Sequence, residues 1–484
     1  MRLFSSLSLA FGVIVTGCGD GSSMNGGAGG SNGTVWPCSE QGIRDAIDEG
    51  GGPHFFDCDG PTTVATEAVL EINNQVWLDG EGNLTIDANR AHRVFELLPM
   101  ADVSLIGMTI TGGDAEALGG GIFSQGKLFL EDCEIVENTS GDIGGGIHSL
   151  FELLVFNSVI SRNEASQGGG AAFSGRAEID GATFANNVGG AIYNSNQLFL
   201  RNAQLVDNTT EFGGGAIVNI GDAFVSNAII TNNRAQSGGG ISNAGYLFLG
   251  ESTVEGNVAD EGGGVYGFDA TRNLDGGDLQ IFSLGWIDSS YTTIANNRAV
   301  NGGGIYSVSI RMTMFDSTVS GNSADEAGGA LYVDGTTLGA STTYLNANTI
   351  VDNTAPSGAA IFSTGETPTL RLAANIIDGD CAVQPSAVID SEGSNLESPG
   401  DTCGLNAATD RVDVTPGELN LGPLADNGGE TETHLPMPGS IAIDAIALED
   451  CDVVLPIVPL LDQRLVMRPQ GAGCDIGSVE VEDQ

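Results

Sequence analysis

The residues of this chain that could carry out chemistry are few, and they are scattered along 484 residues. Polysaccharide lyases need clustered carboxylates to hold Ca²⁺ and an Arg or Lys to remove a proton, and glycosidases need a pair of carboxylates. The histidines that could assist such chemistry share no motif and are His54, His92, His148 and His434. The sequence therefore predicts no catalytic residue, with a polysaccharide lyase or glycoside hydrolase as the alternative.

Two arginines and one tripeptide come nearest to a catalytic pattern. Arg298 and Arg311 lie within about one repeat of acidic residues, which surface Arg–carboxylate pairing explains better than a general base does. The tripeptide Trp286-Ile287-Asp288 resembles part of a lyase motif, but no His follows it. Because Ile287 also falls in an apolar column of the repeat described below, we expect it in the core.

The segment 268–285 interrupts the repeat and holds four charged residues, which form a candidate binding loop. These residues are Asp269, Arg272, Asp275 and Asp278. A long loop on the edge of a solenoid is a common place for function, and the alternative is a tolerated surface insertion. We expect no cofactor other than Ca²⁺, which an acidic chain of this kind could bind.

The elements that must position these residues follow from a repeat of about 24 residues, marked by an Asn and a run of glycines. A fixed period of this length indicates a solenoid. The marker asparagines are Asn138, Asn163, Asn187, Asn208, Asn233, Asn257, Asn297, Asn322 and Asn353. A solenoid offers a long repetitive surface rather than one deep pocket.

Each repeat has apolar residues at fixed positions before its Asn. In the repeat that ends at Asn138 these are Leu128 and Leu130, which are two positions apart, and then Ile135. A spacing of two indicates a strand rather than a helix. The fifth position before the Asn holds small or polar residues, so we expect Cys133 to be a small buried thiol rather than a reactive nucleophile.

Stacking such coils predicts an all-β fold, a right-handed single-stranded parallel β-helix. Like residues lie above like residues, so each apolar position becomes a buried column. We expect the Asn side chains to bond one another and nearby backbone and to tolerate left-handed φ, and the glycines to let backbones approach closely. The flanking segments around Leu105 and Leu372 fit the same register. Roughly 12 to 15 coils would span on the order of 60–70 Å.

Two motifs link the repeat to a known family. Residues 189–192 (Gly-Gly-Ala-Ile) and 184–187 (Phe-Ala-Asn-Asn) resemble the GGA[ILV] and FxxN repeats of the polymorphic outer-membrane proteins. Most repeats here carry Ile, Val or Leu in place of that Phe. The resemblance covers about residues 100–365. It implies a secreted β-helical surface protein, with adhesion as the implied role, and we expect no counterpart of that family's C-terminal membrane barrel.

The charge of the chain limits which molecules it can bind. The chain has 63 acidic and 16 basic residues, which gives a formal net charge of −47. Such a chain repels nucleic acid and anionic lipid head groups, so we expect neither as a partner. We expect a monomer with a solvated acidic surface, and a specific role in binding cations is the alternative.

The N-terminus has the pattern of an export signal. Residues 3–15 form a short apolar segment, and Val15-Thr16-Gly17-Cys18 resembles a bacterial lipobox. This resemblance implies that Cys18 carries a lipid that anchors the chain in a membrane, and an ordinary secretory signal is the alternative. Residue 19 is Gly rather than Asp, which favours sorting of the lipoprotein to the outer membrane.

Six of the other cysteines lie in the flanks of the repeat, in neighbouring pairs about 20 residues apart. The pairs are Cys38 with Cys58, Cys381 with Cys403, and Cys451 with Cys474. Export favours disulfides. Sequence alone does not fix their connectivity, so the pairing of neighbours is a prediction.

Both ends of the solenoid need a cap, because an open end exposes strand edges. Residues 39–49 predict an N-terminal helix, with Ser39 as its N-cap and with Ile43, Ala46 and Ile47 on one face. The first strands are expected at residues 55–57 and 76–78. The expected segments are a signal peptide (1–17), a flexible tether (18–34), the β-helix with its N-terminal cap (35–420) and a C-terminal cap region (421–484).

The C-terminal segment carries motifs without the repeat. They include Thr433-His434-Leu435, Asp462-Gln463-Arg464, Arg468-Pro469 and Cys474-Asp475-Ile476-Gly477. These motifs resemble the C-terminal part of the choice-of-anchor Q family, β-helical bacterial surface proteins with varied anchors. The sequence departs from that family at Glu430 and at residues 465–466. We therefore expect a cell-envelope lipoprotein whose ectodomain binds or adheres to a polysaccharide or another cell-surface partner.

Overall fold

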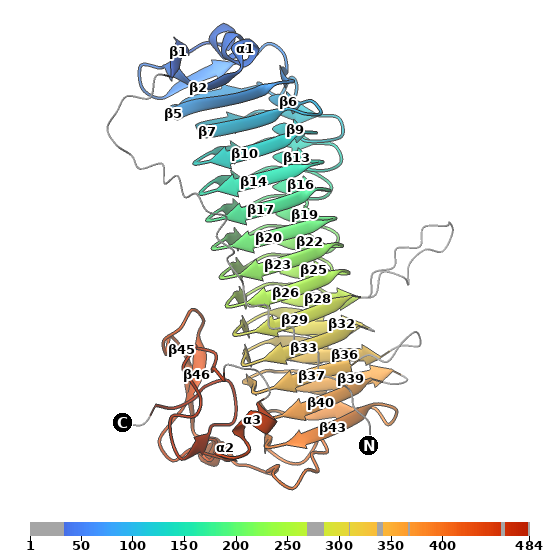
Figure 1. The fold of residues 1–484 in the computed structure, drawn as a ribbon. Helices are drawn as coiled ribbons and strands as arrows, with labels where there is room; N and C mark the ends of the chain where they lie inside the picture. Colours follow the sequence, from blue (N-terminus) through green and yellow to red (C-terminus); the bar gives the residue numbers. More distant parts are fainter. Residues whose placement is uncertain are drawn as a thin grey trace, which may run out of the picture.

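The chain folds into an all-β parallel solenoid of about 12 turns, which confirms the predicted fold class. The structure, a computed structural model, describes residues 33–268, 285–308, 310–335, 342–365, 368–455 and 460–482. Strands of successive coils pair in parallel, as where Leu128 lies beside Leu153 and Leu130 beside Val155. Figure 1 shows the coils stacked into one long column, from α1 (Glu40–Glu49) at one end to β43 (Val388–Gly393) at the other.

The first strand of each coil belongs to a 27-stranded sheet of the described chain. These first strands are β2 (Gly51–Asp57), β5 (Gln75–Asp87), β7 (Asp102–Thr111), β10 (Lys127–Glu131), β14 (Glu152–Phe156), β17 (Arg176–Asp180), β20 (Gln197–Arg201), β23 (Asp222–Ser226), β26 (Tyr246–Gly250), β29 (Trp286–Ser290), β33 (Arg311–Phe315), β37 (Thr342–Asn346), β40 (Thr369–Ala373) and β43. At the N-terminal end β1 (Thr34–Pro37) pairs with β2.

The second strand of each coil follows a tight bend and continues the same sheet. The second strands are β3 (Thr62–Ala65), β11 (Glu134–Val136), β15 (Val159–Ser161), β18 (Thr183–Ala185), β21 (Gln204–Val206), β24 (Ile229–Thr231), β27 (Thr253–Glu255), β30 (Thr293–Ala295), β34 (Thr318–Ser320), β38 (Thr349–Val351), β41 (Ile376–Asp378) and β44 (Leu396–Ser398). The long strands β5 and β7 run through the bend and supply both positions.

The third strands form a separate 13-stranded sheet. They are β4 (Leu70–Ile72), β6 (Phe95–Leu97), β9 (Ile122–Ser124), β13 (Ile147–Ser149), β16 (Ala171–Phe173), β19 (Ile192–Asn194), β22 (Ile217–Asn219), β25 (Ile241–Asn243), β28 (Val265–Phe268), β32 (Ile305–Val308), β36 (Leu331–Gly335), β39 (Ile361–Gly365) and β42 (Cys381–Val383). The turns that lead into them hold the short pairs β8 (Asp114–Ala115) with β12 (Thr139–Ser140) and β31 (Arg298–Asn301) with β35 (Ser323–Ala327).

The predicted apolar columns are the core of the solenoid. In β20, Leu198 and Leu200 are fully buried, while the residues on either side of each lie on the outer surface. This alternation follows from the strand itself, whose successive side chains point to opposite faces. The first, third and fifth residues of each regular first strand therefore face outward, and Ile287 lies in the core as predicted.

The marker asparagines form the predicted ladder inside the solenoid. Asn208 is fully buried, and its Nδ2 donates to Oδ1 of Asn233 at 3.0 Å. Its own Oδ1 accepts from Nδ2 and from the backbone N–H of Asn187, both at 2.9 Å. The predicted left-handed φ is one position out of register, because the residue before the Asn adopts it, as Asp207 does with φ 56°. The Asn itself keeps its amide buried at the bend.

A second asparagine ladder was not predicted. Asn194, Asn219 and Asn243 end consecutive third strands, and Nδ2 of Asn194 donates to Oδ1 of Asn219 at 2.7 Å. The next step, from Asn219 to Asn243, has the same length. This ladder covers only three coils, so it has no period long enough to stand out in the sequence.

The glycine runs serve two roles in the coil. Gly144 adopts φ 71°, which a residue with a side chain rarely adopts. A Cβ on Gly146 would lie 2.6 Å from the carbonyl oxygen of Gly170 in the next coil. The glycines thus allow a sharp bend and a close approach of stacked backbones.

The N-terminal cap agrees with its prediction. Helix α1 starts after Ser39, whose Oγ accepts from the backbone N–H of Gly42 at 3.2 Å. Ile43, Ala46 and Ile47 are buried against the first coils. The two strands expected near residues 55 and 76 are parts of β2 and β5. Among the described residues no helix is long and apolar enough to cross a membrane.

The C-terminal region folds back along the side of the last coils (Figure 1). It contains α2 (Pro416–Leu419), α3 (Cys451–Val454) and two antiparallel pairs, β45 (Leu421–Ala425) with β46 (Thr433–Pro436) and β47 (Ile446–Ala447) with β48 (Gly473–Cys474). Thr318 Oγ1 on β34 donates to Gln463 Oε1 at 2.6 Å, and the backbone N–H of Ser478 donates to Thr349 Oγ1 on β38 at 3.0 Å. The region therefore binds to the outward side of the second strands.

Buried ion pairs also join the C-terminal region to the solenoid. Arg468 forms ion pairs with Asp316 (3.1 Å), just before β34, and with Glu480 (3.4 Å). All three side chains are almost inaccessible to solvent. Burial raises the pKa of Asp316 and of Glu480 to about 7 each, although Arg468 opposes the shift. The conspicuous motif residues Gln463 and Arg468 thus attach the C-terminal region to the solenoid.

Candidate binding face

Several sequence-predicted positions lie outside the described residues. They are the lipidation site Cys18 and the loop residues Asp269, Arg272, Asp275 and Asp278. The anchor and the binding loop therefore remain predictions.

The cysteines with described positions are structural. Disulfides join Cys38 to Cys58, Cys381 to Cys403 and Cys451 to Cys474, which are the neighbouring pairs. Cys133 is free, and its thiol lies in the core. Burial raises the pKa of that thiol to about 11, so it is protonated at neutral pH and is a poor nucleophile.

The four histidines are not brought together. His54 accepts a hydrogen bond from the Trp36 indole in the N-terminal cap, and His148 lies on the outer side of β13. His92 contacts backbone carbonyls near the first coils, and His434 bonds Ser320 in the C-terminal region. Among the described residues, no three His, Cys, Asp or Glu side chains are placed to hold a metal ion.

The tripeptide at residues 286–288 contributes an organised surface site. Trp286 and Asp288 are the first and third residues of β29, so both point outward while Ile287 points inward. The Asp288 carboxylate accepts hydrogen bonds from the Trp286 indole at 2.7 Å and from the Tyr246 hydroxyl at 3.1 Å. Thr313 Oγ1 on β33 is a third donor. Three donors from three successive coils thus fix one carboxylate on the outer face.

Arg311 completes this site, which we call the Asp288 cluster (Tyr246, Trp286, Asp288, Arg311 and Thr313). Its guanidinium lies over the Trp286 ring, 4.4 Å from the ring centroid. The ring of Tyr246 meets the same indole edge-on at 5.7 Å. Burial and the neighbouring Asp288 raise the pKa of the Tyr246 hydroxyl, which keeps it a donor. A cation over an aromatic face is attracted by the negative face of the ring.

Arg311 differs from the other basic residues on this face. Lys127 pairs with Glu152 (3.3 Å), Arg201 with Glu178 (3.4 Å), and Arg371 with carboxylates on β43. Within the described ranges Arg311 has no ion-pair partner, and it is exposed. The surface pairing expected for Arg311 is not seen among the described residues, where its guanidinium stacks on Trp286.

Aromatic rings continue along the same face towards the N-terminal coils. The rings of Phe199 and Phe224 stack at 5.1 Å with planes 10° apart, and Phe224 contacts Tyr246 at 5.5 Å. These residues occupy outward positions of β20, β23 and β26. The Asp288 cluster is thus one end of a partly apolar track that runs parallel to the axis of the solenoid.

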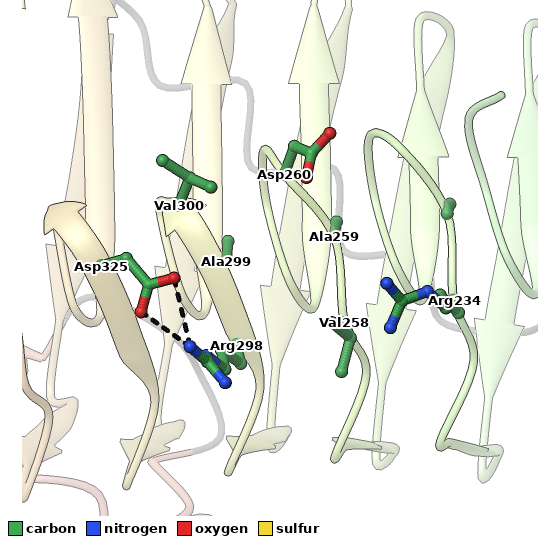
Figure 2. Close-up of a pocket in the computed structure, with 9 residues that line it drawn as sticks. Arg234, Val258, Ala259, Asp260, Arg298, Ala299, Val300 and Asp325 are labelled. Atoms are coloured by element: carbon green, nitrogen blue, oxygen red, sulfur yellow. Dashed lines mark hydrogen bonds and ion pairs between the residues drawn. The ribbon is translucent and has the colours of Figure 1, made fainter. Parts of the chain in front are cut away.

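A shallow hollow of about 210 Å³ lies on another side, at the turns after the marker asparagines. It is lined by Arg234, Ala235, Val258, Ala259, Asp260, Arg298, Ala299, Val300 and Asp325. Figure 2 shows the two arginines on either side of Val258, with Arg298 bonded to both oxygens of Asp325. This confirms the surface pairing predicted for Arg298. The hollow is small, and its two arginines are balanced by two carboxylates.

The Asp288 cluster could be recognised only in part from the sequence. The outward direction of Trp286 and Asp288 follows from the register of Ile287. The contributions of Tyr246, 42 residues earlier, and of Thr313, 25 residues later, depend on which coils are adjacent. The interruption after β28 hides the adjacency of Tyr246 and Asp288, because it lengthens that one repeat.

Comparison with known sequences gives one short match. A profile of the Chlamydia polymorphic membrane protein repeat matches residues 316–334. That segment includes Asn322 and the sequence Gly328-Gly329-Ala330-Leu331. The match supports repeats of this type, as the motifs had indicated. No curated protein sequence matches the chain.

Two solved structures are similar in outline. One is PfbA, a surface adhesin of Streptococcus pneumoniae, with 14% identity, a TM-score of 0.31, and coverage of 74% of this chain and 86% of that one. The other is the pectate lyase Pel9A, with 13% identity, a TM-score of 0.23, and coverage of 93% and 97%. With TM-scores this low, neither structure supports a conclusion about function.

Proposed function

We propose that this protein is a binding module of the cell surface and that it holds a glycan on the outer face of its first strands. The observation that carries the proposal is the Asp288 cluster. It places a fixed carboxylate, an indole and an arginine that has no ion-pair partner among the described residues on one partly exposed surface.

The chemistry of the cluster suits a sugar. Sugars present hydroxyl groups, which bond carboxylates and guanidinium groups, and apolar C–H faces, which pack on aromatic rings. Binding sites combine a few fixed polar groups with aromatic surface in this way. Because the stacked rings of Phe199 and Phe224 extend the surface along the axis, an extended chain fits better than a small molecule.

The location at the cell surface is part of the proposal. It is supported by the lipobox-like sequence at Cys18, by the match to a polymorphic membrane protein repeat, and by the motifs that resemble the choice-of-anchor Q family. We infer that the chain belongs to that class and that a lipid at Cys18 serves as its anchor.

The test is binding of the purified ectodomain, residues 33–484, to a panel of neutral and acidic polysaccharides, with and without Ca²⁺. Trp286→Ala should weaken binding by at least about tenfold, since truncation of a buried aromatic anchor commonly costs 2 kcal/mol or more (about thirtyfold). Arg311→Gln should weaken binding to acidic chains most. Tyr193→Ala, on the outer side of β19 in the other sheet, is the matched control. Equal binding by Trp286→Ala and by the control would refute the proposal.

The alternative, a polysaccharide lyase or hydrolase, can be tested in the same incubations. The appearance of unsaturated or reducing ends would establish it. Both oxygens of Asp288 already accept hydrogen bonds, which favours a role in binding over one as a free base. If an activity is found, its persistence in Asp288→Asn would place the catalytic residues elsewhere.

A further inference from the structure

The 13-stranded sheet carries a second, unrelated concentration of aromatic rings. The outward residues at the centre of four successive third strands are Tyr266 (β28), Tyr306 (β32), Tyr332 (β36) and Phe362 (β39). Their ring centroids are separated by 5.6, 4.4 and 4.8 Å in order. Phe268 stacks beside Tyr266 at 5.3 Å. We call these five residues the tyrosine stack.

The stack is confined to these coils. In coils closer to the N-terminus the same outward position holds Phe123, His148, Ala172, Tyr193, Val218 and Ser242, and in the coil after Phe362 it holds Ala382. Stacking of like rings is therefore not a requirement of the coil, since neighbouring coils fold without it. All five rings are partly exposed. Four coils spaced about 4.8 Å apart give a surface roughly 14 Å long, which matches four or five residues of extended peptide.

The rim of the stack is acidic. Glu261 lies in the turn before β28 and shares a hydrogen bond with Tyr266, and Glu326 lies in the corresponding turn two coils on. Asp334 follows the stack on β36, on the opposite side. The strands β28, β32, β36 and β39 contain no basic residue, and nearby Arg298 is paired with Asp325.

The acidic surroundings affect the ionisation of the tyrosine hydroxyls. Burial, together with Glu261 and Asp334, raises the pKa of Tyr306 and of Tyr332. The hydroxyls of these two residues are also hydrogen-bonded to each other. The stack therefore presents neutral phenols in a region of negative potential, and such a region favours a cation.

The geometry points to a binding surface for a cationic, arginine-containing segment of a partner protein on the tyrosine stack. The aliphatic stems of Arg side chains pack against aromatic edges, while the guanidinium groups reach carboxylates and phenol oxygens. Tyr and Arg are the residue types that dominate binding energy at protein interfaces. The opposite charges would also speed association. This surface lies on a different sheet from the Asp288 cluster, so the two proposals stand or fall separately.

The experiment measures binding of a labelled peptide, acetyl-(Arg-Ser)₄-amide, to the purified ectodomain by fluorescence anisotropy at about 150 mM salt. The peptides acetyl-(Lys-Ser)₄-amide and acetyl-(Glu-Ser)₄-amide are measured in parallel. We expect the arginine peptide to bind tightest and the glutamate peptide not to bind. Tyr306→Ala and Glu261→Gln should each weaken binding of the arginine peptide by about tenfold.

Matched controls separate this site from the general attraction of a polycation to an acidic protein. They are Tyr193→Ala, a single outward tyrosine on the same sheet, and Glu178→Gln, a carboxylate on the other sheet; both should change the affinity less than about twofold. Tyr306→Phe keeps the stack and serves if Tyr306→Ala fails to fold, with a smaller but measurable loss expected. Equal losses in the controls, or no binding at this salt concentration, would overturn the proposal. So would a lowered Tm in Tyr306→Ala with unchanged affinity.

Discussion

Asn208→Ala removes one side chain of the buried asparagine ladder. It should destabilise the protein far more than the loss of one asparagine amide at the surface does. Asn208 is fully buried. The change removes the acceptor of the backbone N–H and of one Nδ2 hydrogen of Asn187. Because Asn187 is also fully buried, neither donor gains access to water.

The magnitude follows from those two donors. A buried polar group left without a partner costs about 1–3 kcal/mol, so the two together cost about 2–6 kcal/mol. The carbonyl oxygens of Phe184 and Val206 lose a donor as well, at 3.0 and 3.1 Å. We therefore expect a loss of about 4 kcal/mol in the free energy of unfolding, a large share of the ~5–15 kcal/mol typical of a domain.

The matched control is Asn202→Gly. Asn202 belongs to an exposed series of amides and adopts φ 50°, and Gly181 occupies the same position one coil earlier. Glycine therefore keeps the backbone, and the loss of exposed hydrogen bonds should cost less than about 1 kcal/mol. Urea unfolding monitored by circular dichroism gives both values, and amide exchange at residue 187 should accelerate only in Asn208→Ala. The reasoning fails if the two variants are equally stable.

Three further predictions concern groups that the fold buries or that anchor it. The Cys133 thiol should resist iodoacetamide at about pH 8 until the protein is unfolded, because burial raises its pKa to about 11; rapid labelling of the native protein would contradict its placement in the core. Because the pKa of Asp316 and of Glu480 is raised to about 7, their contribution to stability is complete below about pH 4 and is lost as pH rises through about 7. Unfolding free energies should therefore be higher at about pH 5 than at about pH 8, by on the order of 2–4 kcal/mol, and Asp316→Asn should flatten this difference; a higher stability at pH 8 would reverse the sign we derive. Cys18→Ser should move the protein from the membrane to the soluble fraction, and unchanged membrane fractionation would refute lipidation.

The interior of the solenoid could be predicted almost residue by residue, because stacking repeats the same environment in every coil. Leu128, Ile135 and Ile287 lie in the core as their positions in the repeat required. A single periodic constraint, burial of like above like, was enough to place them. The same constraint identified Ile287 as a core residue despite its neighbours in a lyase-like tripeptide.

The C-terminal region could not be placed by such reasoning. Arg468 meets Asp316 across 152 residues of sequence, and no period relates the two positions. The sequence showed a group of motif residues, but it did not indicate which part of the solenoid they contact. The structure gives the physical reason for them. Gln463 and Arg468 have polar groups buried against the solenoid, and Asp475 is buried within the C-terminal region, so all three need fixed partners.

The outward positions explain why fold and binding can be separated in this chain. Inward residues of successive first strands are uniformly apolar or small: Leu198, Ala223, Leu247, Ile287 and Met312. The outward residues that follow them change along the axis, from Phe199, Phe224 and Phe248 to Asp288 and Thr313. Pairing of strands requires only the backbone and the inward column, so the coil does not dictate these outward side chains. A binding surface can therefore change from one coil to the next while the core stays the same, and for this reason the candidate sites lie on the outer faces rather than in a cavity.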